Sequence, residues 1–526
     1  MTKDAAEEIG KAYAFEGPAL ELGALVLDGE AHPESRVRVP LSMLNRHGLV
    51  AGATGTGKTK TLQLIAEQLS AAGVPAFLAD IKGDVSGMAA PGEPSDRITS
   101  RAKDTATDWT PTGFPAEFLS LGGVGEGVPV RATITSFGPL LLSKVLGLNE
   151  TQESSLGLVF HFADKAGLPL LDLKDLRAVI THLTSDEGEA DLKELGGLAS
   201  ATAGVILREL ITLETQGGEA FFGEPEFDSA DLLRVAEDGR GVLSIMGLAG
   251  LQDRPKLFST FLMWLLADLF QDLPEVGDVD KPKLVFFFDE AHLLFDDASE
   301  AFLEAITRTV RLIRSKGVGV FFVTQTPKDV PSDVLAQLGN RVQHALRAFT
   351  PDDAKALKAT VGTFPTSDVF DLEELLTQLG IGEAVVTIMS ERGAPTPVAW
   401  TRMRPPASLM AQLPADQHAA IVAASELLDD YGTAVDRESA YEKLLARVAP
   451  APEAPVAEAP ERAPEREAPR DDDEPGAVGK VLGSSVFKSF ARAAATAAGR
   501  EISRSIFGTG RRTTRRKTTK RRGSTW

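Results

Sequence analysis

The feature that most constrains this chain is a run of eight residues, Gly52-Ala53-Thr54-Gly55-Thr56-Gly57-Lys58-Thr59, which fits the pattern G-x-x-x-x-G-K-[ST] at every position. A short apolar strand, residues 48–50, precedes the run, and a helical segment over about 58–72 follows it. Glycines let the backbone wrap so that its N–H groups point at an anion, and the start of the helix adds a positive end. Strand, loop and helix in this order predict a phosphate-binding loop in an α/β sheet.

The loop residues have distinct expected roles. We expect Lys58 to neutralise the β- and γ-phosphates of a nucleotide and the Thr59 hydroxyl to ligate Mg²⁺. The alternative is a glycine-rich turn that matches by chance, and the flanking strand and helix argue against it. No Asn-Lys-x-Asp motif for reading guanine occurs, so ATP is the predicted nucleotide. The predicted nucleotide-binding residues are Gly52, Ala53, Thr54, Gly55, Thr56, Gly57, Lys58, Thr59 and Lys60.

A second constellation is the acidic pair that ends an apolar strand over residues 284–288. We expect Asp289 to hold Mg²⁺, directly or through water, and Glu290 to accept a proton from the attacking water. Two adjacent carboxylates at the end of a buried strand repel each other and lose hydration unless a cation lies nearby. The alternative, a strand that turns acidic at the surface, is weakened by the phosphate-binding loop upstream. The pair favours hydrolysis over phosphoryl transfer to a small molecule.

A further strand over residues 318–324 ends at Gln325. A polar side chain on a strand beside the acidic pair can reach the γ-phosphate and the lytic water, so Gln325 is a candidate sensor of the γ-phosphate. The alternative is that Gln325 caps the loop before Pro327.

Periodicity and composition divide the chain into segments. The sheet-forming core is assigned to 48–85 and 239–404. The other assignments are a short β-rich segment over 1–47, a mainly helical insertion over 86–238, a helical extension over 405–448, a disordered Pro/Ala/Glu linker over 449–475, an amphipathic helix over 476–510 and a basic tail over 511–526.

Charge is unevenly distributed along the chain. The net charge is −20, and because residues 476–526 hold thirteen Lys/Arg and one acidic residue, a balance of +12, the first 475 residues carry −32. An acidic body argues against a broad nucleic-acid surface, but a local basic patch or channel remains compatible with one. The sequence contains no cysteine, which excludes disulfides and thiolate metal sites. The acidic N-terminus and the absence of a long apolar run predict a soluble, cytoplasmic protein.

Taken together, these motifs resemble those of the HerA/FtsK superfamily of P-loop motors, and most closely the bacterial HerA-helicase-like (YjgR-type) family. The likeness covers about residues 17–404 and the segment 486–507. It rests on Asn45-Arg46-His47-Gly48, the run 52–59, Asp80-Ile81-Lys82-Gly83-Asp84, Asp289-Glu290-Ala291-His292, residues 319–327 and the run from Asn340 to Arg347.

The resemblance implies a RecA-like core with a mainly parallel sheet, and six subunits in a ring with ATP at their interfaces. Relatives carry an arginine finger shortly before the Gln-bearing strand, usually in a Gly-Arg-Lys context, whereas this chain reads Arg314-Ser315-Lys316-Gly317. The candidates for that role are Arg314 and Lys316, with Arg341 and Arg347 as rivals. Each could instead be a solvated basic residue, and a lysine is a poorer planar match for phosphate. The archaeal helicases of the superfamily carry an N-terminal barrel, for which this chain has no room.

Two functional hypotheses follow. In the first, the protein is an ATP-driven motor that forms a hexamer and acts on DNA. In the second, it is an ATPase that remodels or signals to protein or membrane partners, recruited through the C-terminal helix and basic tail. The basic tail could grip phosphates through salt-sensitive contacts, or could merely keep the protein in solution.

Overall fold

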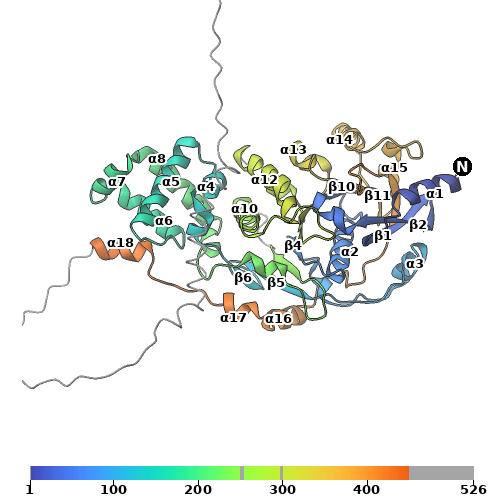
Figure 1. The fold of residues 1–526 in the computed structure, drawn as a ribbon, viewed down its shortest axis with the longest axis horizontal. Helices are drawn as coiled ribbons and strands as arrows, with labels where there is room; N and C mark the ends of the chain where they lie inside the picture. The colour runs from blue at the N-terminus through green and yellow to red at the C-terminus, as the bar shows by residue number, and fades with distance from the viewer. Residues whose placement is uncertain (1, 249–253, 296–299, 449–526) are drawn as a thin grey trace, which may run out of the picture. The chain divides into compact units, whose positions relative to one another are not determined.

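A computed structural model describes residues 2–248, 254–295 and 300–448 (Figure 1). The predicted linker over 449–475, the helix over 476–510 and the basic tail over 511–526 lie outside the described residues. Within them, no helix is both long and apolar enough to cross a membrane.

The described residues contain one 12-stranded sheet, in the order β2-β1-β12-β11-β10-β3-β9-β8-β4-β7-β5-β6. The run from β10 to β6 is parallel throughout, whereas β11, β12, β1 and β2 add to one end as antiparallel neighbours. The mainly parallel α/β fold predicted from the sequence is therefore confirmed. The strands are β1 (Ala19–Leu27), β2 (Glu30–Pro40), β3 (Gly48–Ala51), β4 (Ala76–Asp80), β5 (Ala116–Leu121), β6 (Val128–Val130), β7 (Leu243–Gly247), β8 (Leu284–Phe288), β9 (Val318–Thr324), β10 (Asn340–His344), β11 (Glu383–Thr387) and β12 (Ala399–Met403).

Helices pack against both faces of the parallel strands. Every residue of β8 and β9 is buried, as expected for strands covered on two sides. Alternate side chains of β8 point to the two faces of the sheet. Phe287 joins the core that includes α2 (Lys58–Ala71). Phe286 packs against Phe77 with the two rings tilted, and Phe77 contacts Phe261 of α10 (Pro255–Asp272). The other helices around these strands are α3 (Asp96–Asp104), α11 (His292–Phe295), α12 (Glu300–Ile313), α13 (Ser332–Leu335), α14 (Pro351–Val361) and α15 (Leu372–Gln378), with 3-10 turns η1 (Leu41–Arg46), η2 (Ser86–Ala89), η4 (Arg314–Lys316) and η5 (Pro327–Asp329).

The N-terminal segment differs from its prediction. Residues 1–47 were expected to be β-rich, but a helix, α1 (Thr2–Ala12), comes first and packs on β2. The two strands that follow extend the main sheet through β12 and do not form a separate unit. Tyr13, fully buried, fixes the end of α1, because its hydroxyl lies within hydrogen-bonding distance of the carbonyls of Pro397 at 2.7 Å and Val386 at 2.9 Å and shares its one proton between them.

The predicted insertion over 86–238 is shorter than expected. Its first part contains β5 and β6, which extend the parallel sheet beyond β7. These strands escape a search for periodicity because they are short, and a loop with glycines at 122, 123, 125 and 127 separates them. The helical part follows as α4 (Ile134–Val145), α5 (Glu150–Lys165), α6 (Leu173–Leu183), α7 (Glu189–Leu195), α8 (Ser200–Thr215) and α9 (Gly218–Phe221), with η3 (Ser229–Leu233) before β7.

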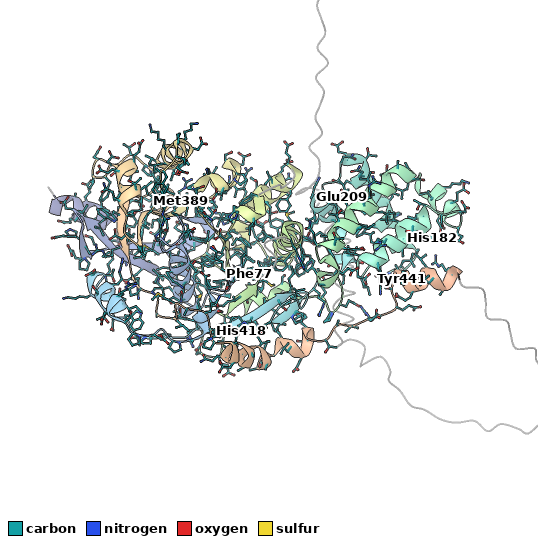
Figure 2. All side chains as sticks on the ribbon, turned by 180° about the vertical axis from the view of Figure 1, so that it is seen from behind. Phe77, His182, Glu209, Met389, His418 and Tyr441 are labelled. Atoms are coloured by element: carbon teal, nitrogen blue, oxygen red, sulfur yellow. The ribbon has the colours of Figure 1, made fainter. Side chains whose placement is uncertain are left out.

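The segment after β12 runs back across the sheet. Residues 404–413, which we call the strap, are extended, so the helical extension expected over 405–448 begins only at α16 (Ala415–Ala423). His418 of α16 stacks on Phe118 of β5 with ring centroids 4.0 Å apart (Figure 2). Next comes α17 (Leu427–Tyr431), which contacts β6. Finally, α18 (Ala440–Val448), which carries Tyr441, packs on α6 of the helical insertion (Figure 2).

Candidate nucleotide site

The phosphate-binding loop is anchored to the ends of β9 and β10, the two strands that flank β3. Gly52 N donates to the carbonyls of Thr324 at 3.2 Å and Gln325 at 3.1 Å, immediately after β9, and Ala53 N donates to the carbonyl of Ala345, after β10, at 2.8 Å. These bonds fix the path of the loop at the carboxyl edge of the parallel strands, where α/β sheets bind ligands.

The start of the loop tolerates no side chain. Gly52 has φ 153°, and a Cβ there would lie 2.5 Å from the Cβ of His344. Burial lowers the pKa of His344 to about 4, so this imidazole is neutral and packs beneath the loop. Its Nδ1 donates to the carbonyl of Glu383 and its Nε2 accepts from the hydroxyl of Thr61, both at 2.8 Å. His344 therefore supports the loop, a role that the sequence did not indicate.

Lys58 lies folded back on the loop. Its Nζ donates to the carbonyls of Gly52 at 2.7 Å and Ala53 at 3.2 Å. Burial lowers the pKa of Lys58, while the charges of Glu290 and then Asp289 raise it, so the amine and the two carboxylates lie close enough to interact. A phosphate could replace the two carbonyls as the partner of this amine. Lys60, by contrast, donates from its Nζ to the carbonyl of Met410 at 2.6 Å. Any contact of Lys60 with a phosphate would therefore be made by its main-chain N–H group.

The acidic pair ends β8 as the sequence predicts. Asp289 is 3% exposed and Glu290 6%. Glu290 has φ 49°, an unusual conformation for a residue with a side chain, and its N–H donates to Asp289 Oδ1 at 2.9 Å. Burial, followed by the charge of Glu290, raises the pKa of Asp289 to about 7. Asp289 Oδ2 and Glu290 Oε2 are buried without a hydrogen-bond donor.

The residues present fit a magnesium ion. An unpaired buried carboxylate oxygen beside another carboxylate is costly unless a cation compensates it, and Asp289 Oδ2 is such an oxygen. Mg²⁺ takes oxygen ligands, commonly one or two carboxylates together with substrate phosphates. Thr59, half-buried at the start of α2, is the second protein ligand that we expect. No group of three or more His, Cys, Asp or Glu in the described residues could hold a metal ion, so phosphate or water oxygens would have to complete this site.

One charged residue at the site was not predicted to act there. Lys82, in the loop after β4, forms a close ion pair with Glu290 Oε1. Burial is the largest single influence and lowers the pKa of Lys82, but the hydrogen bond to Glu290 and the nearby carboxylate charges, first that of Glu290 and then that of Asp289, together raise it. Asp80 shapes this loop by accepting from Gly83 N at 2.7 Å and Val85 N at 3.2 Å. The motif Asp80–Asp84 supported the family resemblance, but nothing in the sequence shows that its lysine meets Glu290.

Gln325 lies beside the loop, and the predicted role of its side chain at the γ-phosphate stays a prediction. Its carbonyl accepts from Gly52 N, and the residue is exposed. Its strand, β9, lies between β3, which leads into the loop, and β8, which carries the acidic pair. The three strand ends thus bring the predicted site residues of one subunit together.

Three of the four finger candidates, Arg314, Lys316 and Arg341, lie away from the loop of their own chain. Arg314 and Lys316 precede β9, whose seven residues span roughly 20 Å, so they are at the opposite edge of the sheet from Gln325. Arg341, near the start of β10, directs its guanidinium to the carbonyls of residues 335, 338 and 363. Only the rival Arg347 reaches the loop of its own chain, with Nη2 3.5 Å from the carbonyl of Thr54.

The structure adds Arg46 to the finger candidates. Arg46 and Arg314 both approach Asp278 Oδ1, at 3.4 and 3.5 Å, and Asp278 is 83% exposed. Burial, then repulsion by Arg314, lowers the pKa of Arg46. Two guanidinium groups that share one exposed carboxylate leave positive charge available to an outside anion. Asn45-Arg46-His47-Gly48 is part of the family resemblance, but the approach of Arg46 to Arg314 depends on the tertiary fold and has no signal in the sequence.

Comparisons with known proteins show which proteins this chain resembles. The chain is 22% identical over 355 residues to the "DNA double-strand break repair helicase HerA" of Sulfurisphaera tokodaii. This alignment covers 66% of this chain and 64% of that protein. It is 20% identical over 388 residues to the protein of the same name from Saccharolobus solfataricus, covering 72% of this chain and 68% of that one. The chain thus spans only about two thirds of the length of these relatives.

Among solved structures, the plasmid coupling protein TrwB in complex with ADP and Mg²⁺ matches with a TM-score of 0.49 at 15% identity, over 75% of this chain and 99% of that one. VirB4 of Thermoanaerobacter pseudethanolicus matches with a TM-score of 0.46 at 13% identity, over 74% and 97%. The family model described as "Helicase HerA-like C-terminal" matches residues 26–516. The chain therefore belongs to the helicase HerA-like C-terminal family.

Proposed function

We propose that this protein hydrolyses ATP in a magnesium-dependent reaction at the site formed by the phosphate-binding loop and the acidic pair. The observation that carries the proposal is the strand order β3-β9-β8. It supports a common site for Lys58 and Asp289, which are more than two hundred residues apart in the chain, and the interaction between their charges agrees with it.

Each residue has a role that its surroundings support. The N–H groups of 52–60 and the start of α2 bind the phosphates, and Lys58 exchanges its carbonyl partners for phosphate oxygens. Thr59 and Asp289 would hold Mg²⁺, which when bound neutralises charge on the phosphates. Glu290 accepts the proton of the attacking water, and Gln325 orients that water or contacts the γ-phosphate.

A ring, with six subunits as the expected number, is the assembly that the charged residues favour. Arg314 and Lys316 cannot reach the loop of their own chain, because β9 separates them from it. In a head-to-tail ring the same residues face the site of a neighbour. Arg314, supported by Arg46, is the finger that we favour, because a guanidinium matches phosphate geometry better than the ammonium of Lys316, and the guanidinium of Arg341 is held by main-chain carbonyls.

DNA is the proposed substrate of the motor. The support is the name of the two curated relatives, each a DNA double-strand break repair helicase. One observation favours the alternative, a protein or membrane partner without nucleic acid. The total net charge is −20 and residues 476–526 carry +12, so the first 475 residues carry −32. DNA must then meet a local basic surface and not the body as a whole.

An ATPase assay with and without duplex and single-stranded DNA at low salt tests the proposal. We expect Mg-dependent turnover in the native protein, a rise with DNA, and a loss of at least about a hundredfold in Lys58→Ala. Lys281→Ala is the matched control, because its Nζ bonds the carbonyls of Ala72 and Gly73, remote from the loop. Turnover that DNA leaves unchanged would favour the alternative cargo. Equal turnover in the native protein and Lys58→Ala would refute the ATPase assignment.

A further inference from the structure

The ion pair between Lys82 and Glu290 occupies the carboxylate that the proposed reaction needs. Lys82 Nζ contacts Oε1 of Glu290, and Oε2 faces His292 Nδ1 at 3.3 Å without a hydrogen bond. The Glu290 side chain is only 8% exposed, whereas that of Lys82 is 43% exposed. The lysine therefore approaches the buried carboxylate from the open side of the site, and it neutralises the charge of this carboxylate and covers one of its two oxygens.

The backbone beneath Lys82 is fixed on two sides. Asp80 accepts from two N–H groups of the loop, and Gln412 of the strap donates to the carbonyl of Lys82 at 3.2 Å. A Cβ on Gly83 would lie 3.2 Å from the Gln412 amide, so the strap also packs closely on this loop. The Cα of Lys82 is thus held in place, while its four-carbon side chain is free to change partner.

Charged groups of both signs face one another at the site before any nucleotide arrives. Two carboxylates, Asp289 and Glu290, face two ammonium groups, Lys58 and Lys82, and the charge of Lys82 lowers the pKa of Lys58. A triphosphate adds several negative charges, and the γ-phosphate adds those nearest the acidic pair. A partly exposed ammonium gains more from phosphate oxygens, with their higher charge, than from a carboxylate that is already close to a second lysine.

We propose that Lys82 is a γ-phosphate sensor, which releases Glu290 and pairs with the γ-phosphate when ATP binds, so that the base becomes free only in the presence of a triphosphate. This inference rests on the proposed function, to which it adds one step: Lys82 changes its partner from Glu290 to the γ-phosphate. No covalent bond is made or broken in the exchange, because one hydrogen-bonded ion pair replaces another. ADP lacks the γ-phosphate and therefore leaves the ion pair intact.

Equilibrium binding of ADP and of a non-hydrolysable ATP analogue, both with Mg²⁺, tests the exchange without requiring turnover. In Lys82→Met, which keeps the length of the side chain and removes its charge, we expect affinity for the analogue to fall about tenfold and affinity for ADP to stay the same. Lys82→Arg keeps the charge and is expected to keep the preference for the triphosphate. Lys281→Met, a lysine remote from the site, controls for the loss of one positive charge.

A double-mutant cycle separates a sensor from a structural ion pair. Glu290→Gln releases Lys82, so the analogue should bind severalfold more tightly than to the native protein, and Lys82→Met/Glu290→Gln should show no such gain. Steady-state kinetics of Lys82→Met should show a KM for ATP raised about tenfold with kcat within about threefold of native, because Glu290 is no longer covered.

Equal losses for ADP and the analogue in Lys82→Met, or no loss for either, would overturn the sensor. So would a fall in kcat at unchanged KM, which a fixed positioning contact predicts. Failure of the proposed function looks different: native protein and Lys58→Ala would then turn over ATP equally, whatever the binding data for Lys82 show.

Discussion

At the scale of single residues, the site is defined by polar atoms that are buried and incompletely paired. Asp289 is 3% exposed and its Oδ2 has no donor, although buried polar groups are nearly always hydrogen-bonded. Glu290 adds a strained φ of 49° and a second unpaired oxygen. Such costs persist where the surrounding fold imposes them, and they gather at functional sites. The two carboxylates at the end of β8 are therefore better explained by a role in binding a cation and a water molecule than by a contribution to the stability of the fold.

Replacing the proposed base tests its role directly. In Glu290→Gln the side chain keeps its size but cannot accept a proton, so we expect kcat for ATP hydrolysis to fall about a hundredfold or more. ATP should still bind, because the phosphate-binding loop is untouched. A filter-binding or stopped-flow measurement of bound, unhydrolysed ATP checks the second part.

Glu373→Gln is the matched control for this prediction, since Glu373 is an exposed residue of α15. It should leave both binding and turnover at native values. Native turnover in Glu290→Gln would remove Glu290 from the reaction.

At the scale of elements, the strap ties the helix of the phosphate-binding loop to the rest of the chain. Lys60, Gln63 and Glu67 lie on one face of α2, at helical spacing, and each bonds the strap. The Glu67 carboxylate accepts from Ala407 N at 2.9 and 3.0 Å and from Ser408 N at 3.2 Å. Gln412 of the strap also donates to the carbonyl of Lys82, so the strap contacts both α2 and the loop after β4.

The contact between Glu67 and the strap predicts a pH dependence of stability. Burial raises the pKa of Glu67 from 4.5 to about 7, despite bonds from the strap. The folded state therefore binds its proton more tightly than the unfolded state, so this contribution is complete below about pH 4.5 and is lost as the pH rises to about 7. We expect the free energy of unfolding of the native protein, relative to Glu67→Gln, to fall by about 2 kcal/mol between about pH 5 and pH 7.5.

Urea denaturation at several pH values measures this difference. The Gln side chain does not titrate, so the comparison removes the other ionisable groups of the protein, and Arg404, the charge that faces Glu67, is present in both variants. Parallel stability curves for the two proteins would show that Glu67 keeps its ordinary pKa in the folded state.

Elements also show what could be predicted from the sequence. The strands over 284–288 and 318–324 match β8 and β9 residue for residue, because continuous apolar runs indicate strands buried on both faces. β5 and β6 were assigned to a helical insertion because each is too short to show a period. The phosphate-binding loop is local in sequence and was found, whereas Lys82 meets Glu290 only through the pairing of β4 with β8.

At the scale of the whole molecule, the sheet separates two sets of charged residues. The loop, the acidic pair and Gln325 lie at the carboxyl edge of the parallel strands, and Arg46, Arg314 and Lys316 lie at the other. A single subunit therefore holds a phosphate site and a separate group of cations that its own phosphates cannot reach. Head-to-tail association would bring the cations of one subunit into contact with the phosphate site of the next. Because the two groups are apart within one subunit, we expect ATPase activity to depend on assembly.

Mixing two inactive variants tests this dependence. Lys58→Ala removes the phosphate lysine from a subunit's own site, and Arg314→Ala removes the proposed finger that acts on the neighbour. Each variant alone is expected to lose most of its turnover. In an equal, randomly assembled mixture, about one quarter of the interfaces would join an intact loop to an intact arginine, so we expect turnover near a quarter of the native value if sites act independently.

If Arg314 acted within its own subunit, or only stabilised the fold, every subunit in the mixture would still carry a defect at its own site and no turnover would return. Lys316→Ala mixed with Lys58→Ala serves as the matched pair, because Lys316 is held over the ring of Phe270 with its Nζ 5.0 Å from the centroid. Recovery in the Arg314 mixture, together with near-native turnover of Lys316→Ala alone, would assign the finger to Arg314. Recovery in the Lys316 mixture, together with near-native turnover of Arg314→Ala alone, would assign the finger to Lys316. The proposal of a ring would hold in either case.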